Sequence, residues 1–238
     1  RSKMSYVDAL FDRDHDQIKV VERKDGKRSF REYPVKYTFY YKDQRGKYKS
    51  VYGDPLSRIV CKNTKDFRKE VAINRDKQLF ESDINPIFQC LSENYLNQDA
   101  PKLNIAFFDI ETDFNKELGF APPEDPFNAV TAISVHLSWM KRTFCLAIKP
   151  KTLTTEAAEE ICNKFEDTLL MDTEEEMLGA FLDLIDDCDI MSGWNSEGFD
   201  IPYTVNRVAR VLSKSHTRQF CLWGQYPKRR TFERFGAE

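Results

Sequence analysis

The sequence predicts an α/β (α+β) fold with a mixed sheet, preceded by a small, mixed and β-rich amino-terminal domain. After residue 100, three apolar runs of strand length follow one another, and helix, strand and helix patterns come next. That order is typical of an α/β domain with a mixed sheet. The turn-forming stretch Gln98-Asp99-Ala100-Pro101 separates this part from the first hundred residues, so we expect domains at residues 4–100 and 101–238.

The first hundred residues carry strand patterns rich in β-branched and aromatic residues. Strands are predicted at Lys19–Val21, Val35–Tyr41 and Lys47–Tyr52. Asn63 or Thr64 is expected to cap a helix over Asp66–Asn74. Aromatic residues are frequent here and are mixed with Lys and Arg, which is typical both of a nucleic-acid-binding sheet and of an aromatic core, and the core interpretation is favoured.

The second part is predicted element by element from its apolar patterns. Strands are expected at Leu103–Ile110, Ala129–Trp139, Thr143–Ile148 and Asp189–Ser192. Helices are expected at Thr155–Leu170, Thr173–Asp187 and Asp200–Leu212. In the last helix Ile201, Val205, Val208 and Leu212 recur at the spacing of one helix face, which predicts that this face is buried.

Charge is distributed unevenly along the 238 residues. Residues 1–100 carry a net charge of +5, residues 101–200 carry −14, and residues 201–238 carry +6. The acidic block fits a solvated helical face, and it also fits carboxylates that bind a divalent metal beside a basic track for phosphates. Charge alone leaves both interpretations open.

Composition also bears on the cellular compartment. No stretch approaches the roughly 18–20 uncharged apolar residues of a membrane span, and no charged-then-apolar leader opens the chain. We therefore expect a cytoplasmic protein without a membrane partner. The six cysteines are scattered, without zinc-site spacing, and are expected to be reduced core residues.

The first chemical motif is Phe107-Phe108-Asp109-Ile110-Glu111-Thr112. Residues two apart in a strand share a face, so Asp109 and Glu111 are expected to point the same way. Two carboxylates side by side repel each other and lose hydration, and bound divalent cations commonly offset that cost. A polar strand end that meets solvent is the alternative interpretation.

The second motif is Ser192-Gly193-Trp194-Asn195-Ser196-Glu197-Gly198-Phe199-Asp200-Ile201-Pro202-Tyr203. A short strand is expected to turn here at a Gly- and Asn-rich loop and to enter a helix near Asp200. A carboxylate at this helix start faces the strand ends and can be held by helix amides. An ordinary first-turn acid would explain Asp200 but not the rest of the loop.

Together these motifs resemble the first two exonuclease motifs of family B DNA polymerases, in the same order and about ninety residues apart. Residues 47–53 and the stretch that begins at Lys65 are similar to the same region of the T-even phage polymerases. The resemblance covers essentially the whole chain. It identifies the chain as the amino-terminal part of such a DNA-directed DNA polymerase.

The resemblance implies a ribonuclease H-like exonuclease domain that removes 3′-terminal nucleotides from DNA with two divalent metal ions, Mg²⁺ or Mn²⁺. In that scheme Asp109 bridges both ions, Glu111 binds the ion that activates water, and Asp200 holds the other. Asn195, Thr112 and Phe199 are expected to contact the single-stranded 3′ end. Phe120, in the Pro-rich loop, is a candidate wedge against an unpaired base, and a loop-anchoring role is the alternative.

Basic residues after the second motif are a further candidate DNA contact. They are Lys214, Arg218, Lys228, Arg229, Arg230 and Arg234. A solvated tail is the alternative interpretation of these residues.

One departure from the family pattern bears on activity. No Tyr-x-x-x-Asp motif follows Asp200, so we expect an exonuclease domain that is incomplete at its carboxyl end and a chain that is weakly active or inactive by itself. The remainder of the polymerase is then supplied in cis or by a separate chain. A binding or assembly subunit of a split polymerase is the competing function, and the resemblance also leaves RNA binding by the amino-terminal domain open. If the protein is phage-encoded, the expected location is the host cytoplasm.

Overall fold

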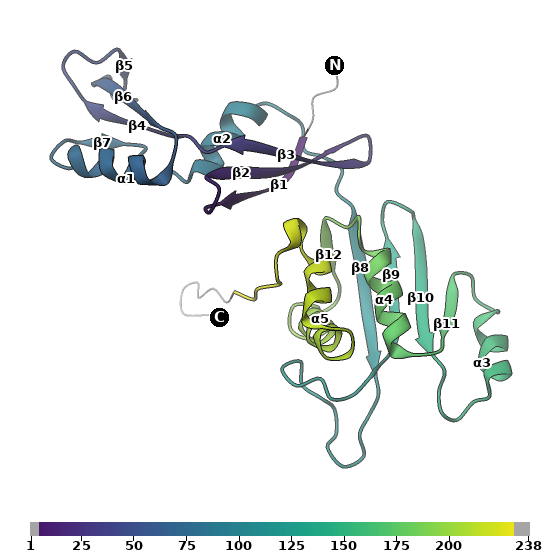
Figure 1. The fold of residues 1–238 in the computed structure, drawn as a ribbon. Coiled ribbons are helices and arrows are strands. Elements are labelled where there is room, and N and C mark those ends of the chain that lie inside the picture. Colours follow the sequence, from purple (N-terminus) through teal and green to yellow (C-terminus); the bar gives the residue numbers. More distant parts are fainter. Residues whose placement is uncertain (1–4, 231–238) are drawn as a thin grey trace. The chain divides into compact units, whose positions relative to one another are not determined.

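A computed structural model describes residues 5–230, and the chain divides into two compact units between Lys102 and Leu103 (Figure 1). Arg234 and the other residues at the two ends of the chain lie outside the described residues. Among the described helices, none combines the length and the apolar character that crossing a membrane requires. No disulfide joins the cysteines between residues 5 and 230.

The first unit begins with an antiparallel sheet in the order β1-β2-β3. Its strands are β1 (Ser5–Asp12), β2 (Gln17–Lys24) and β3 (Lys27–Pro34). Asp25 and Gly26 have φ angles of 50° and 78° and make the tight turn between β2 and β3. Only the middle strand of this sheet, β2, was predicted from the sequence.

A second antiparallel sheet follows, in the order β5-β6-β4-β7. Its strands are β4 (Tyr37–Lys42), β5 (Tyr48–Lys49), β6 (Pro55–Cys61) and β7 (Leu79–Phe80). The strand predicted over Lys47–Tyr52 is therefore too long. Ser50 accepts a hydrogen bond from the Gly53 amide, and this turn ends the strand after Lys49.

Two helices complete the first unit, α1 (Thr64–Ile73) and α2 (Pro86–Tyr95). The Asn63 side chain accepts a hydrogen bond from the Asp66 amide, so Asn63 is the cap of α1. Phe67 of α1 stacks on Tyr37 with ring centroids 4.3 Å apart. Tyr37 and Phe39 are buried in the core of this unit, as the core interpretation of the aromatic residues predicted for these two positions.

The second unit contains a five-stranded sheet in the order β11-β10-β9-β8-β12. Its strands are β8 (Ile105–Thr112), β9 (Val130–Leu137), β10 (Arg142–Ile148), β11 (Thr168–Met171) and β12 (Ile190–Ser192). The three strands β8, β9 and β10 are antiparallel, whereas β12 runs parallel to β8 and β11 parallel to β10. The mixed sheet of the predicted fold class is therefore confirmed.

Helices α4 (Glu174–Leu184) and α5 (Asp200–Val211) pack on this sheet, and α3 (Thr155–Cys162) lies next to the edge strand β11 (Figure 1). Met177, Phe181 and Tyr203 of α4 and α5 are fully buried against the sheet. The short 3-10 helices Lys214–Phe220 and Leu222–Gly224 follow α5.

The helix predicted over Thr155–Leu170 is wrong in its second half. The helix ends at Cys162, and Thr168–Met171 forms β11. A four-residue apolar run has no periodicity that separates a strand from a helix. This run forms a strand because it pairs with Cys145–Ile148 of β10, more than twenty residues away in sequence.

Candidate active site

Strand β8 presents its two carboxylates on one exposed face. Ala106, Phe108 and Ile110 are buried in the core, whereas the alternate side chains Asp109 and Glu111 are exposed. This is the strand alternation that the sequence predicted. Asp109 lies opposite Ser134 of β9, and Glu111 lies opposite Ala132.

A glycine brings the second motif against the same strand. Ser192 at the end of β12 pairs with Phe107, and Gly193 follows directly. A Cβ atom on Gly193 would lie 2.4 Å from the Phe108 carbonyl oxygen, a distance that no side chain can occupy. Glycine at this position therefore lets the loop from Gly193 to Phe199 run beside the Phe108–Asp109 peptide.

Asp200 is the first residue of α5, and its side chain is only 5% exposed. One of its carboxylate oxygens accepts a hydrogen bond of 3.2 Å from the amide of Ile110, the residue between Asp109 and Glu111. Burial raises the pKa of Asp200, and the negative charges of Asp109 and Glu111 raise it further, while the Ile110 amide acts in the opposite direction. The three carboxylates therefore share one electrostatic environment.

Replacing Asp200 by asparagine is expected to raise the free energy of unfolding at neutral pH in metal-free buffer. A raised pKa in the folded state means that the folded chain favours protonated Asp200. The contribution of Asp200 to the free energy of unfolding is therefore fully present below its unfolded pKa of about 3.9. That contribution is lost as the pH rises through the folded pKa, whereas asparagine keeps the acceptor without the charge. Each kcal/mol gained should raise Tm by about 2–4 °C.

Thermal unfolding at several pH values measures this effect, with exposed Asp183→Asn as the matched control. The gain in Tm from Asp200→Asn over the wild type should become smaller as the pH is lowered. Because metal binding stabilises the folded state by mass action, Mn²⁺ should favour the native carboxylate over asparagine. An Asp200→Asn chain that is less stable at neutral pH would contradict the electrostatic argument.

The chemistry of these residues suits a hard divalent cation, because carboxylate oxygens are the ligands that Mg²⁺ and Mn²⁺ prefer. Between residues 5 and 230, however, no three side chains of the His, Cys, Asp or Glu type form a ready-made metal cluster. Asp200 is turned toward the Ile110 amide. These carboxylates are the right type of ligand for such an ion. To coordinate it, the side chains must rotate, further ligands must be added, or both.

Thr112 and Phe120 lie where β8 leaves the sheet. Thr112 is the last residue of β8, and the register with β9 shifts between Glu111 and Thr112. Phe120 is 73% exposed, and its ring meets Phe114 edge to face at 4.9 Å. The wedge and anchor interpretations of Phe120 are both compatible with this exposed pair.

Asn195 and Phe199 belong to the loop that connects β12 to α5. Asn195 has a φ angle of 50°, a left-handed conformation that asparagine tolerates better than most residues. Its carbonyl oxygen accepts hydrogen bonds from the amides of Gly198 and Phe199. Phe199 packs against the core beside Tyr203, with ring centroids 5.1 Å apart.

The predicted basic residues follow α5 in the sequence. Lys214 and Arg218 lie on the 3-10 helix Lys214–Phe220 that follows α5. Both cations contact the Tyr226 ring, and Arg218 also donates a hydrogen bond of 2.6 Å to the Gly224 carbonyl. Lys228, Arg229 and Arg230 are exposed and outside any helix or strand, and the same prediction for Arg234 falls outside the described residues.

Sequence reasoning missed Trp194, which is 93% exposed on the loop beside β8. An indole that is left in water next to a candidate nucleic-acid site is a ready stacking surface. The sequence contained a sign of this exposure, because Trp194 lies in a predicted loop between Gly193 and Asn195, where few apolar residues are available to bury it. Phe114 was missed as well, since its pairing with Phe120 depends on the fold of the loop.

Comparison with known families gives one match that covers most of the chain. Residues 56–231 match the family described as DNA polymerase family B, exonuclease domain. The matched range includes Asp109, Glu111 and Asp200, and it begins inside the first unit.

Two curated relatives are phage proteins. The chain is 26% identical over 199 residues to the DNA-directed DNA polymerase of Escherichia phage RB69, which covers 74% of this chain and 22% of the relative. It is 26% identical over 246 residues to the DNA-directed DNA polymerase of Enterobacteria phage T4, which covers 92% of this chain and 27% of the relative. The chain therefore spans about a quarter of the length of these relatives.

Proposed function

This chain belongs to DNA polymerase family B through its exonuclease domain, and from that premise we propose that it carries a 3′→5′ exonuclease site centred on Asp109, Glu111 and Asp200. The proposed reaction is removal of 3′-terminal nucleotides from single-stranded DNA ends. We assign this activity to residues 101–238 and an amino-terminal polymerase domain to residues 4–100.

The observation that carries the proposal is the hydrogen bond from the Ile110 amide to Asp200. It links the start of α5 to the peptide between the two exposed carboxylates of β8. A buried carboxylate in this position, with its pKa raised by burial and by two neighbouring acids, is unfavourable for the fold alone. Groups with such perturbed pKa values are concentrated at functional sites.

The family implies two divalent ions, Mg²⁺ or Mn²⁺, which when bound polarise the scissile phosphate and supply the attacking water in a reactive form. In our proposal Asp109 would be shared by the two ions, Glu111 would help to hold the ion that supplies the water, and Asp200 would help to hold the other. The Ile110 amide is hydrogen-bonded to the Asp200 carboxylate, and the exposed face of β8 leaves Asp109 and Glu111 accessible to the DNA end.

Other residues are proposed to position the DNA strand. Thr112 ends β8 next to Glu111, and Asn195 lies on the exposed loop after Gly193. The exposed ring of Phe120 and the half-buried ring of Phe199 are proposed to contact the terminal bases. The basic residues Lys214, Arg218, Lys228, Arg229 and Arg230 are proposed to contact phosphates further along the strand.

The full activity is proposed to need more of the polymerase than this chain contains. The names of the relatives support a role in DNA-directed DNA synthesis, with proofreading by the exonuclease site. A further carboxylate, from the family's Tyr-x-x-x-Asp motif, would come from polymerase sequence in cis or from a separate chain. The phage relatives support the host cytoplasm as the place of action.

Metal binding by the chain alone is expected to be weak. Calorimetric titration with Mn²⁺ should give a dissociation constant near the weak end for oxygen-ligand sites, about 10⁻⁴–10⁻³ M, because the carboxylates are not pre-assembled. Asp109→Ala should remove the binding, and Glu117→Ala on the exposed loop should not. Equal binding by the wild type and Asp109→Ala would remove the proposed metal site.

RNA binding by the first unit is a second proposed function, and an open aromatic surface supports it. Tyr40 and Tyr48 meet edge to face at 5.4 Å, and the Arg58 guanidinium lies 4.9 Å from the Tyr48 ring centre. These three residues, the Tyr40–Tyr48–Arg58 patch, lie on the side of the β4–β6 sheet opposite the buried Tyr37 and Phe39. Exposed rings beside a guanidinium are typical of single-strand binding surfaces.

Charge around this patch also suits a phosphate backbone. Residues 36–62 contain seven Lys and Arg residues and two aspartates. Asp54 is paired with Lys42 at 2.7 Å, and Asp43 accepts a hydrogen bond of 2.6 Å from Ser57. The remaining cations give this segment a positive field that attracts nucleic acid.

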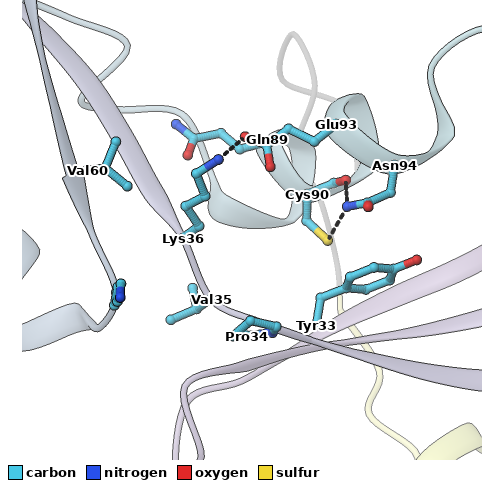
Figure 2. Close-up of a pocket in the computed structure, with 10 residues that line it drawn as sticks. Tyr33, Pro34, Val35, Lys36, Val60, Gln89, Cys90, Glu93 and Asn94 are labelled. Carbon is cyan, nitrogen blue, oxygen red and sulfur yellow. Dashed lines mark hydrogen bonds and ion pairs between the residues drawn. The ribbon is translucent and has the colours of Figure 1, made fainter.

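A cavity of about 520 Å³ lies at the end of the same sheet, between β6 and α2 (Figure 2). Val35, Pro34 and Val60 make its apolar wall, while Lys36 pairs with Glu93 at 2.7 Å at its edge. The Gln89 amide hydrogen-bonds both backbone groups of Thr38, which holds α2 against β4. The size and the apolar wall of this cavity suit one unstacked base.

Removing the Tyr40–Tyr48–Arg58 patch is expected to weaken binding of single-stranded RNA. Loss of one stacked base costs about 1–3 kcal/mol, so Tyr48→Ala/Arg58→Ala should raise the dissociation constant by about five- to 150-fold. Fluorescence anisotropy with labelled RNA and DNA oligonucleotides measures this change. Phe88→Ala, an exposed aromatic on α2, is the matched control, and equal affinities for both variants would contradict the patch.

A further inference from the structure

The segment from Asp113 to Ala129, here called the 113–129 loop, joins β8 to β9 without a helix or strand of its own. Its tip is closed by paired hydrogen bonds between Asn115 and Gly119, and it carries the exposed Phe114 and Phe120. Pro122, Pro123 and Pro126 supply no backbone N–H groups. The Pro-rich part of the loop therefore has fewer backbone donors, and its own backbone hydrogen bonds are the short turns from Asp125 to Pro122 and from Phe127 to Asp125.

Side chains of α5 donate further hydrogen bonds to the Pro-rich part of the loop. The Tyr203 hydroxyl donates a buried hydrogen bond of 2.7 Å to the Asn128 carbonyl. Asn206 donates to the Pro123 carbonyl at 2.8 Å, and Arg207 donates to the Pro126 carbonyl at 2.9 Å. These donors recur every three or four residues, so one stripe of α5 runs along the loop.

Arg207 also connects the loop to α4. Its guanidinium donates two hydrogen bonds, of 2.7 and 2.6 Å, to the Glu174 carboxylate, and both side chains are only 12% exposed. Glu174 accepts a further hydrogen bond of 2.8 Å from the Val130 amide, at the first residue of β9. Arg207 and Glu174 therefore hold the end of the loop, α4 and α5 in one arrangement.

The same helix begins at Asp200, which is bound to the Ile110 amide of β8. We propose that Tyr203 and Arg207 are positioning residues that fix the 113–129 loop relative to Asp109 and Asp200, so that Phe114 and Phe120 meet the unpaired 3′-terminal nucleotide at a set distance from the carboxylates. This role rests on the proposed exonuclease function. Neither residue touches the reacting phosphate; each acts through the loop.

Two readouts separate positioning from general stability. Hydrogen–deuterium exchange of the full chain should show the 113–129 peptides exchanging about tenfold faster in Tyr203→Phe and Arg207→Met, with β9 and β10 peptides unchanged. In the exonuclease assay, KM for single-stranded DNA should rise about tenfold while kcat stays within about twofold, because the loop binds DNA and the carboxylates are untouched.

Arg142→Met is the matched control, since it breaks an Arg142–Asp167 pair in the same unit but far from the loop. Arg207→Lys should restore part of the wild-type exchange and KM, because lysine keeps the charge and one contact. Exchange that rises equally in all peptides would mean that Arg207 only stabilises the fold, and loop exchange equal to that of Arg142→Met would also overturn the proposal. Failure of the exonuclease function itself would appear as a chain that stays inactive when extended through a Tyr-x-x-x-Asp motif, while the exchange result still tests the positioning role.

Discussion

A chain in which Asp109 and Glu111 are both alanine is expected to lose the proposed exonuclease activity by at least about a hundredfold. A misplacement of about 1 Å in a reacting group can already have an effect of this size, and the double substitution removes both exposed carboxylates of β8. The wild-type chain is itself expected to be slow, since its three carboxylates form no ready-made metal cluster in the described part of the chain.

A 3′-labelled single-strand assay with Mn²⁺ tests this expectation. It should compare the wild type, the double variant and the same chain extended through a Tyr-x-x-x-Asp motif, with Glu159→Ala/Glu160→Ala on α3 as the matched surface control. The extended chain should be the fastest. Cleavage that survives in the double variant would refute the proposed site, and an extended chain without activity would refute the exonuclease function.

Gly193→Ala is expected to damage both the stability and the activity of the second unit. The new methyl group would lie 2.4 Å from the Phe108 carbonyl oxygen and 3.3 Å from the Ser196 Cβ atom, so the backbone of the loop or of β8 must move. Overpacking of this kind lowers the free energy of unfolding by about 1–3 kcal/mol. Because the loop leads into Asp200, the same movement should lower the exonuclease rate by about a hundredfold.

Gly179→Ala provides the matched control for this substitution. Gly179 lies within α4, and an added Cβ atom would meet nothing within 4 Å. Alanine is favoured over glycine in a helix by about 1 kcal/mol, so this variant should be more stable than the wild type. Chemical denaturation of both variants measures the difference, and a Gly193→Ala chain as stable and active as Gly179→Ala would show that the close contact has no consequence.

Local patterns predicted those parts of the site that depend on neighbouring residues. The alternation of β8 placed Asp109 and Glu111 on one face, and the glycine-rich turn before Asp200 placed that residue at a helix start. These features follow from strand and helix geometry within a few residues.

Features that depend on distant pairing were not predicted. β11 is a strand because it pairs with β10. Helix α2 is a different case, because its local signal, the Asn85 cap followed by Pro86, was present and was missed. The bond between Asp200 and the Ile110 amide joins residues ninety positions apart, and no local pattern contains it. The stripe of α5 donors was hidden for the same reason, because Tyr203 and Arg207 look like ordinary residues of an amphipathic helix.

The bonds from α5 to the 113–129 loop have a consequence for how this surface can evolve. The acceptors at Pro123, Pro126 and Asn128 are main-chain carbonyls, which every amino acid possesses. The exposed side chains of Lys116, Glu117, Leu118 and Glu124 can therefore be exchanged while the loop keeps its path, provided that Tyr203, Asn206 and Arg207 are kept. A randomised library at these positions would sample new DNA-end preferences on a constant scaffold, in the way that antibody loops vary on a fixed framework.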